Sequence, residues 1–326
     1  MMSKMHRTKG MLGALVVAWA LAACGGGGSG NGTASSAASA TPATGVAGTD
    51  AAAPALSGNV ATDGRNWINY RRSQIGLPTL EHNATIDSAA QGHSDYQRIN
   101  NTVTHDQQAG KQGFTGAALA DRMRAAGYTF TGSNAIGEVI AASSRQNGFT
   151  MAEELVTAIY HRFVMFEPQF KEIGSGAAAT SAGYNYLTAD FAANNGLGSG
   201  LAAGALAAWP FNGQTQVQVN FLSDSEEPDP VPDRNEVGYP ISLQTNLSNV
   251  IAVQSFTVRP RGATTDLATR QVDNQVASSN PLQRHNLSAV AIIPLAPLAA
   301  ATIYDVTFIG TLNGAAVGKT WSFTTK

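Results

Sequence analysis

Four stretches in the middle of the chain place apolar residues three or four positions apart, as the buried face of a helix does. Residues 63–75 are followed by Gly76, which can end a helix, and residues 84–100 put small apolar side chains on one stripe. Residues 115–127 begin at a threonine and end at a glycine, while residues 150–162 begin with T-M-A-E, the order of a capping box. The pattern therefore predicts four helices.

The next part of the chain changes to the alternation that is typical of strands. Residues 173–180 and 184–192 alternate weakly around a glycine, which predicts a hairpin, and residues 216–222 (QVQVNFL) alternate cleanly. The Gly- and Ala-rich stretch 192–208 lacks such a pattern and is interpreted as a loop. Because helices come first and strands follow, we expect an α+β layer structure over residues 61–225.

The carboxyl-terminal third has no helical period. Residues 226–238 hold three prolines among acidic residues, which predicts a stiff linker. In residues 239–326, short segments rich in β-branched and aromatic residues are separated by turn residues, and Asn313-Gly314 is a strong hairpin signal. This spacing predicts an all-β sandwich. The closing P-L-A-P-L-A-A-A-T-I-Y-D-V-T-F and W-S-F-T-T are similar to segments of the bacterial immunoglobulin-like domains of surface proteins.

Residues 1–23 have the three parts of an export signal. Three basic residues give a positive front end, an apolar stretch follows, and the segment ends in L-A-A immediately before Cys24. This ending resembles the bacterial lipoprotein box, in which the cysteine sulfur receives a diacylglycerol. An ordinary secretory signal with a chance cysteine is the alternative. The apolar stretch is too short to span the ~30 Å hydrocarbon core of a membrane.

A lipid on Cys24 would tether the chain to a membrane rather than make it span one. The glycine after the cysteine, by resemblance to bacterial sorting rules, favours the outer membrane. Residues 24–60 are mostly Gly, Ser, Ala, Thr and Pro, which bury too little apolar surface to offset the entropy of ordering. We therefore expect a flexible tether between the lipid and the folded part, and localisation in the cell envelope.

Composition, charge and cysteine count exclude several classes of function. The chain has 326 residues, of which 20 are basic and 22 acidic, and loss of residues 1–23 would leave 17 basic residues against 22 acidic ones. Because no run of Lys or Arg is present, nucleic acid is excluded as a partner. The single cysteine excludes an intrachain disulfide framework and a multi-cysteine zinc site. A G-x-S-x-G motif is absent, which argues against a serine-hydrolase elbow.

Five segments occur in an order that is similar to bacterial CAP-superfamily domains, the group of cysteine-rich secretory proteins, antigen 5 and pathogenesis-related proteins. They read NYRRSQIGLPTLEHNATIDSAAQGHSDY, NNTVTHDQ, DRMRAAGY, GEVI and YHRF…F…EIGSG. The resemblance covers about residues 61–225, half of the chain. It implies a three-layer α-β-α sandwich, which agrees with the helices and strands predicted above.

The resemblance also implies a cleft with two histidines and two acidic residues that can hold a divalent cation. Matched by motif, the first histidine is His105 in TVTHDQ, the first glutamate is Glu138 in GEVI, and the second histidine is His161 in YHRF. The family's second glutamate lies in a W-x-x-E turn that is missing here, although Glu153 and Glu154 lie nearby in the sequence. Imidazoles with a carboxylate suit zinc or a similar ion that keeps an open coordination position.

Three interpretations of His105, Glu138 and His161 stay open. They are a structural hydrogen-bond network, a non-catalytic site for a lipid, an envelope polymer such as peptidoglycan or a protein, and a metal-dependent hydrolase in which Glu138 activates a metal-bound water. Of these we expect ligand binding without catalysis. Elsewhere, His93 is expected to be a buried histidine bonded to a carbonyl, and Arg122 to belong to a surface charge pattern.

Overall fold

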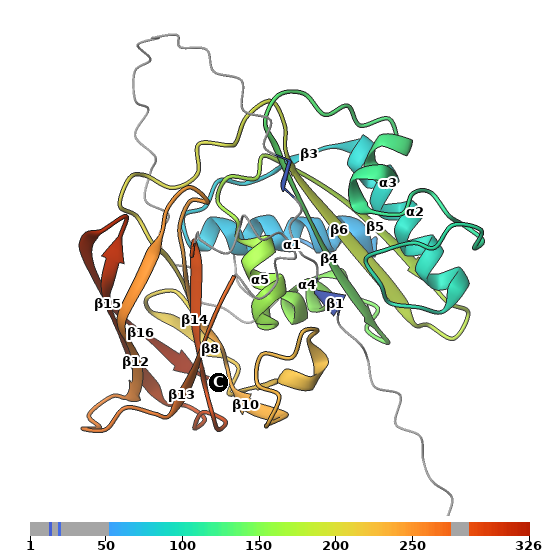
Figure 1. Ribbon diagram of the computed structural model, residues 1–326. Helices are drawn as coiled ribbons and strands as arrows, with labels where there is room; N and C mark the ends of the chain where they lie inside the picture. Colours follow the sequence, from blue (N-terminus) through green and yellow to red (C-terminus); the bar gives the residue numbers. More distant parts are fainter. Residues whose placement is uncertain (1–12, 15–18, 21–51, 275–286) are drawn as a thin grey trace, which may run out of the picture.

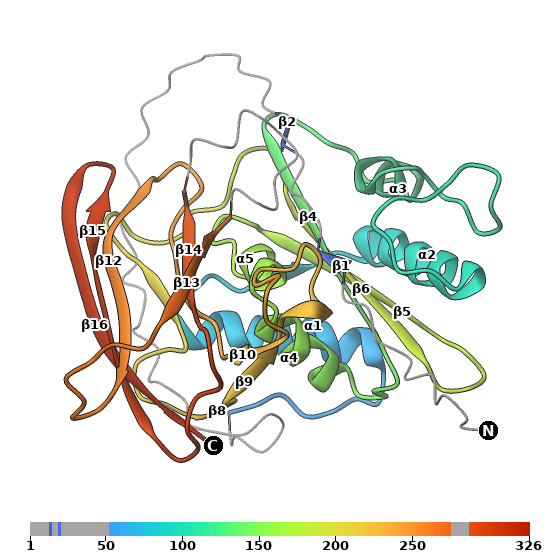
Figure 2. The ribbon, with the colours of Figure 1, turned by 60° about the horizontal axis from the view of Figure 1, so that its bottom comes forward.

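The computed structural model describes residues 13–14, 19–20, 52–274 and 287–326 of the chain. Most of the predicted export signal, the predicted lipidation site Cys24 and most of the predicted tether lie outside these described residues. Within them, no helix is both long enough and apolar enough to cross a membrane. The described residues form two lobes that pack side by side (Figures 1 and 2).

A mostly antiparallel sheet forms the middle of the first lobe (Figure 1). Its strands are β1 Gly13–Ala14, β2 Trp19–Ala20, β3 Glu81–His82, β4 Asn134–Ser143, β5 Glu172–Ala179 and β6 Asn185–Ala193. β6 lies between β4 and β5, and the short β3 joins the outer edge of β5 in parallel. The two-residue strands β1 and β2 pair with the other edge of β4. The predicted hairpin is thus confirmed as β5 and β6.

Helices cover both faces of this sheet, which makes three layers (Figure 2). They are α1 Val60–Gln74, α2 Ala84–Asn100, α3 Leu119–Ala125, α4 Gly148–Thr157 and α5 Ile159–Met165. α2 and α3 lie on one face, where they enclose a small core with β4 and β6. α1, α4 and α5 cover the other face and share the main core. The predicted α+β class is therefore confirmed, with the helix–sheet–helix layering that the resemblance implied.

Two glycines of β5 let α2 lie directly against the sheet. A Cβ atom at Gly174 would lie 2.3 Å from the backbone nitrogen of Asp87, and one at Gly176 would lie 2.1 Å from that of Gln91. No side chain fits in such a gap, so the G-S-G of β5 is a packing requirement. The close approach fixes the height of α2 above the sheet and so positions the polar side chains between them.

Asparagine side chains cap the starts of α1 and α4, where the sequence predicted starts at Asp63 and Thr150. The Oδ1 atom of Asn59 accepts from the backbone of Thr62, so α1 begins three residues before the predicted range. Asn147 caps α4 in the same way. The predicted fourth helix is broken at Ala158, whose extended backbone separates α4 from α5. Glu153 is therefore not a capping residue; it forms an ion pair with Arg71.

The second lobe consists of two four-stranded sheets and a small two-stranded one. The first sheet has the order β13-β14-β11-β7 and the second the order β12-β15-β16-β8, while β9 pairs with β10. The bounds are β7 Ala207–Trp209, β8 Gln214–Val217, β9 Asn220–Leu222, β10 Glu236–Gly238, β11 Ile241–Gln244, β12 Ile251–Pro260, β13 Thr269–Asp273, β14 Ala289–Pro294, β15 Ile303–Leu312 and β16 Ala315–Thr325, with a short 3₁₀ helix at Ser223–Ser225. The predicted Asn313-Gly314 turn joins β15 to β16.

The second lobe takes its first strands from residues that the sequence analysis assigned to the first. β7 pairs with β11, and β8 pairs in parallel with β16 at the end of the chain. The stretch 216–222 is thus divided between β8 and β9 instead of forming one strand, and the predicted linker 226–238 contains β10. The physical reason is that both strands find their partners far along the chain, which local alternation does not reveal.

The two lobes share a continuous apolar interface around α5. Ile159, Tyr160 and Phe163 of this helix join a buried cluster with strands of the second lobe, including Ala291 and Ile293 of β14. The main core likewise runs from α1 and α4 into both sheets of the second lobe. Because large apolar contacts of this kind resist relative motion, the second lobe forms a fixed wall against the first.

Candidate functional site

The layer between α2, α3 and the sheet contains a buried carboxylate, Glu138, that is held by two side chains. The Nδ1 atom of His105 lies 2.8 Å from its Oε1 atom, and Nη2 of Arg122 donates to its Oε2 atom at 2.6 Å. Nη1 of Arg122 also donates to the backbone carbonyl of His105 at 2.7 Å. The three residues therefore form a closed polar cluster in which each fixes the position of the next.

The charge of Glu138 is maintained by its surroundings. Burial alone would raise the pKa of Glu138, but the positive charge of Arg122 and the hydrogen bond from His105 hold it well below its ordinary value. Glu138 is therefore an ionised carboxylate, which accepts hydrogen bonds only. His105 must then donate through Nδ1–H, which fixes the orientation of its ring.

His93 of α2 lies beside this cluster and stays neutral. One ring nitrogen, Nε2, donates to the carbonyl of Thr104 at 2.7 Å, and the other accepts from the Gln107 side chain at 3.0 Å. Burial lowers the pKa of His93, despite the carboxylate of Glu138 at 3.9 Å. The prediction of a buried histidine bonded to a carbonyl is confirmed. Its contacts hold the loop that carries His105.

Asp190 on β6 lies directly opposite Glu138 on β4. Among the described residues, neither of its carboxyl oxygens has a hydrogen-bond donor, and the residue is fully buried. Burial, and then the charge of Glu138, raise the pKa of Asp190 well above its ordinary value. Since two neighbouring buried carboxyls cannot both ionise, Asp190 keeps its proton and directs it to Glu138.

The variant Asp190→Asn tests this protonation. Folded Asp190 keeps its proton to a higher pH than the unfolded group, so its contribution to stability falls as pH rises from about 4 towards its folded pKa. Asparagine does not titrate, yet its amide can still donate to Glu138. We therefore expect the melting temperature of the variant, relative to the wild type, to increase steadily above about pH 4. A difference that is constant with pH would show that Asp190 is ionised.

The ring of His105 leaves one nitrogen without a partner. Among the described residues, no group forms a hydrogen bond with Nε2 of His105, and this atom is itself buried, although the side chain as a whole keeps 12% of its surface exposed. Of the two tautomers of an imidazole, the one that donates through Nδ1–H has its acceptor at Nε2. The cluster thus contains one buried ring nitrogen that has no hydrogen-bond donor among the described residues, on a side chain that is partly exposed.

His161 is not part of this cluster, which corrects the predicted set of three residues. It lies on α5, on the other face of the sheet, where a Cβ at Gly137 would touch Val164 of the same helix. Because neighbouring residues of a strand point to opposite faces, Glu138 and α5 are separated by the sheet itself. His161 is buried, and its Nδ1 atom lies 3.0 Å from Oε1 of Glu226.

Glu226, a residue of the predicted linker, caps the start of α5. Its carboxylate accepts hydrogen bonds from the backbone nitrogens of Ile159, Tyr160 and His161 at 2.8, 2.6 and 3.1 Å. These are the free donors at the start of a helix, which a carboxylate satisfies well. The carboxylate next to His161 therefore comes from the predicted linker, not from Glu153 or Glu154.

Because His161 lies apart from His105 and Glu138, the three residues do not form the predicted zinc site. Within the described ranges, no three His, Cys, Asp or Glu side chains are grouped so that they could hold a metal ion. The carboxylate of Glu138 already forms an ion pair with Arg122. The permanent positive charge of Arg122 opposes the binding of a metal cation at the same carboxylate. The metal-dependent hydrolase that needs His105, Glu138 and His161 together is therefore not assembled.

Two residues of the cluster were missed by the sequence analysis. Arg122 was interpreted as a surface charge but is fully buried against Glu138. Its signal was present, since it lies three positions after Leu119 and next to Met123, on the apolar stripe of α3. Asp190 stands between Ala189 and Phe191 in β6, and a carboxylate in such a setting indicates a buried partner.

Comparison with known proteins agrees with this fold. Residues 66–191 match the model of the family described as Cysteine-rich secretory protein family, CAP. The matched range runs from α1 to β6 and includes His105, Arg122, Glu138 and Asp190. The first lobe is therefore similar to the CAP family over this range, and the second lobe lies outside the match. A search of curated proteins found no match.

Three solved structures are similar to part of the chain. An extracellular protein containing an SCP domain from Bacillus anthracis str. Ames is 25% identical, with a TM-score of 0.34, over 40% of this chain and 39% of that one. An outer surface protein from Borrelia burgdorferi is 17% identical, with a TM-score of 0.34, over 40% and 90%. Venom allergen-like protein 4 from Schistosoma mansoni is 10% identical, with a TM-score of 0.29, over 45% and 96%. The chain thus spans less than half of the Bacillus anthracis protein.

Proposed function

We propose that this protein is exported, is anchored to the cell envelope through a lipid on Cys24, and uses its CAP domain to bind a ligand without catalysing a reaction. The observation that carries the proposal is the Nε2 atom of His105, which is buried without a hydrogen-bond donor among the described residues, on a partly exposed side chain held by Glu138 and Arg122. A fixed acceptor costs little entropy when a ligand donor pairs with it. The candidate ligands are a lipid, an envelope polymer such as peptidoglycan, and a protein.

Binding is favoured over catalysis because the cluster lacks the other parts of a catalytic site. Nucleophilic catalysis needs a hydroxyl or thiol hydrogen-bonded to the histidine, and among the described residues Nε2 of His105 has no such partner. Both ring nitrogens of His93 are occupied, and His161 lies behind the sheet with Glu226. A single oriented imidazole can recognise a donor group, which is what the proposal requires.

Binding by the full mature chain tests the role of His105. Sedimentation with lipid vesicles and with purified peptidoglycan should show saturable binding to one of the two, and His105→Ala should weaken it by about tenfold, the effect of one lost hydrogen bond of about 1.4 kcal/mol. His82→Ala is the matched control, because His82 is half-exposed and pairs only with Asp87. Equal binding by the wild type and His105→Ala, or no saturable binding to either material, would contradict the proposal.

The lipid anchor is tested separately with Cys24→Ser. If a diacylglycerol is attached to the cysteine sulfur, the variant should fail to incorporate labelled fatty acid and should leave the membrane fraction in cells that express it. The wild-type chain, processed in the same cells, is the control for export. Unchanged membrane association of the variant would favour the alternative of an ordinary secretory signal.

A further inference from the structure

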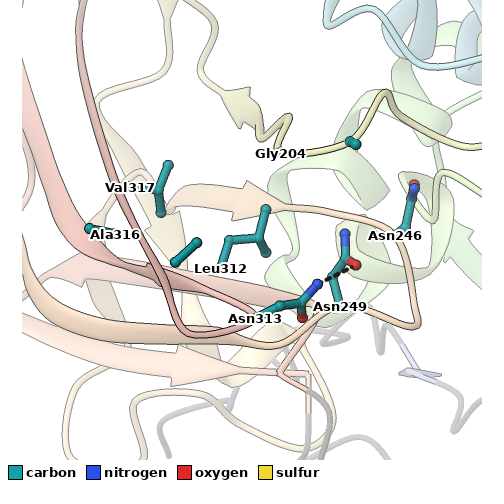
Figure 3. A pocket seen from close by; sticks show the side chains of 9 residues that line it. Gly204, Asn246, Asn249, Leu312, Asn313, Ala316 and Val317 are labelled. Atoms are coloured by element: carbon teal, nitrogen blue, oxygen red, sulfur yellow. Dashed lines mark hydrogen bonds between the residues drawn. The ribbon is translucent and has the colours of Figure 1, made fainter.

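A pocket of about 460 Å³ lies in the second lobe, at the end of the β15–β16 hairpin (Figure 3). Its walls come from three places: the tip of that hairpin, the loop after β11, and residues 203–204 of the connection from the first lobe. Three asparagines, Asn246, Asn249 and Asn313, line it together with small aliphatic side chains. None of the lining residues is charged.

One of these asparagines already binds a peptide unit. Asn246 accepts from the backbone nitrogen of Leu201 at 2.7 Å and donates through Nδ2 to the carbonyl of the same residue at 2.9 Å. Both polar atoms of the side-chain amide are thus used to bind the backbone N–H and C=O of one residue. Asn246 therefore shows that a primary amide in this wall can bind a backbone N–H and a backbone C=O at the same time.

The other two asparagines keep hydrogen-bonding capacity. Nδ2 of Asn313 donates to Oδ1 of Asn249 at 2.9 Å (Figure 3), and Nδ2 of Asn249 donates to the Thr245 hydroxyl at 3.0 Å. A primary amide has two N–H donors, so within the described residues each of these nitrogens has a second one left. The pocket therefore combines neutral donors with an aliphatic wall that includes Leu312, Ala316 and Val317.

We propose that this pocket binds an uncharged, extended peptide with small or aliphatic side chains. The asparagine amides would pair with the peptide backbone, as Asn246 does with Leu201, while the aliphatic wall receives the side chains. A charged ligand is disfavoured, because the lining offers no opposite charge to compensate for its lost hydration. A sugar is disfavoured because none of the lining residues is aromatic. The proposal does not depend on the His105 cluster, which lies in the other lobe.

The test uses the full mature chain and a blocked eight-residue peptide, Ala-Thr-Val-Ser-Ala-Thr-Val-Ser, in a calorimetric titration. We expect one-to-one binding that is lost when the threonines are replaced by glutamates. Ala316→Trp, which fills the pocket, should raise the dissociation constant about tenfold or more. Ala300→Trp is the matched control, since Ala300 is also an exposed alanine but does not line the pocket.

A second variant distinguishes loss of the binding site from misfolding of the protein. Asn249→Asp has nearly the same shape and still accepts from Asn313, but it loses the amide donors and adds a negative charge, so it should also weaken binding about tenfold. No binding of the neutral peptide, equal binding by Ala316→Trp, or binding of tri-N-acetylglucosamine in place of the peptide would overturn the proposal.

Discussion

Replacing Arg162 by methionine is expected to destabilise the protein by about 3–5 kcal/mol, which approaches the total stability of many domains. The guanidinium of Arg162 is fully buried and donates to the carbonyls of Val156 and Pro240 at 2.6 and 2.8 Å. It also lies 5.1 Å from the ring centre of Tyr239. Methionine fills similar space but leaves these carbonyls buried without a donor.

Urea denaturation of the purified chain measures this effect. Arg145→Met is the matched control, because Arg145 is exposed and its ion pair with Glu154 should contribute less than about 1 kcal/mol. Since Arg162 belongs to the first lobe and Pro240 to the second, we also expect both lobes to unfold in one transition in the wild type. A loss below about 1 kcal/mol for Arg162→Met would contradict the structural role assigned to this residue.

Replacing Glu138 by alanine is expected to cost a similar amount, about 3–5 kcal/mol, for a different reason. The substitution leaves the guanidinium of Arg122 buried without its counter-charge and removes the acceptor of His105 Nδ1. Asp190, which keeps its proton because Glu138 is charged, could then ionise and compensate in part. Thermal and urea unfolding measure the loss, and Glu154→Ala, at a half-buried surface pair, is the control.

A double variant separates the ion pair from simple loss of packing. Glu138→Ala combined with Arg122→Met removes both charges, so no buried ion is left unpaired. We expect it to be more stable than Glu138→Ala alone, because the cost of a stranded charge exceeds the net benefit of the pair. If the two single losses instead add without coupling, Arg122 and Glu138 do not interact as the 2.6 Å contact indicates.

Features that depend on neighbours in the sequence could be predicted from it. α2 occupies the predicted residues 84–100, because its small side chains let it pack closely against the glycines of β5. The Asn313-Gly314 turn was predicted for a local reason as well, since both residues adopt positive φ. The meeting of His105 with Glu138 was implied by resemblance alone, and the structure shows the contact.

Features that depend on distant partners could not be predicted in this way. Arg122 on α3 and Asp190 on β6 are both buried beside Glu138, which lies on a third element, β4. The pairing of β8 with β16 joins residues that are more than a hundred positions apart. Local alternation shows that such segments are strands, but it carries no information about which lobe they join.

Glu226 has a practical consequence for dissecting this chain. A fragment that stops at the end of the family match, or at the predicted border of residue 225, would lose the carboxylate that caps α5 and accompanies His161. The same cut would uncover the apolar side of α5. The first lobe is thus not an independent folding unit in sequence, because the start of its last helix, α5, is capped by a residue from the segment that leads into the second lobe.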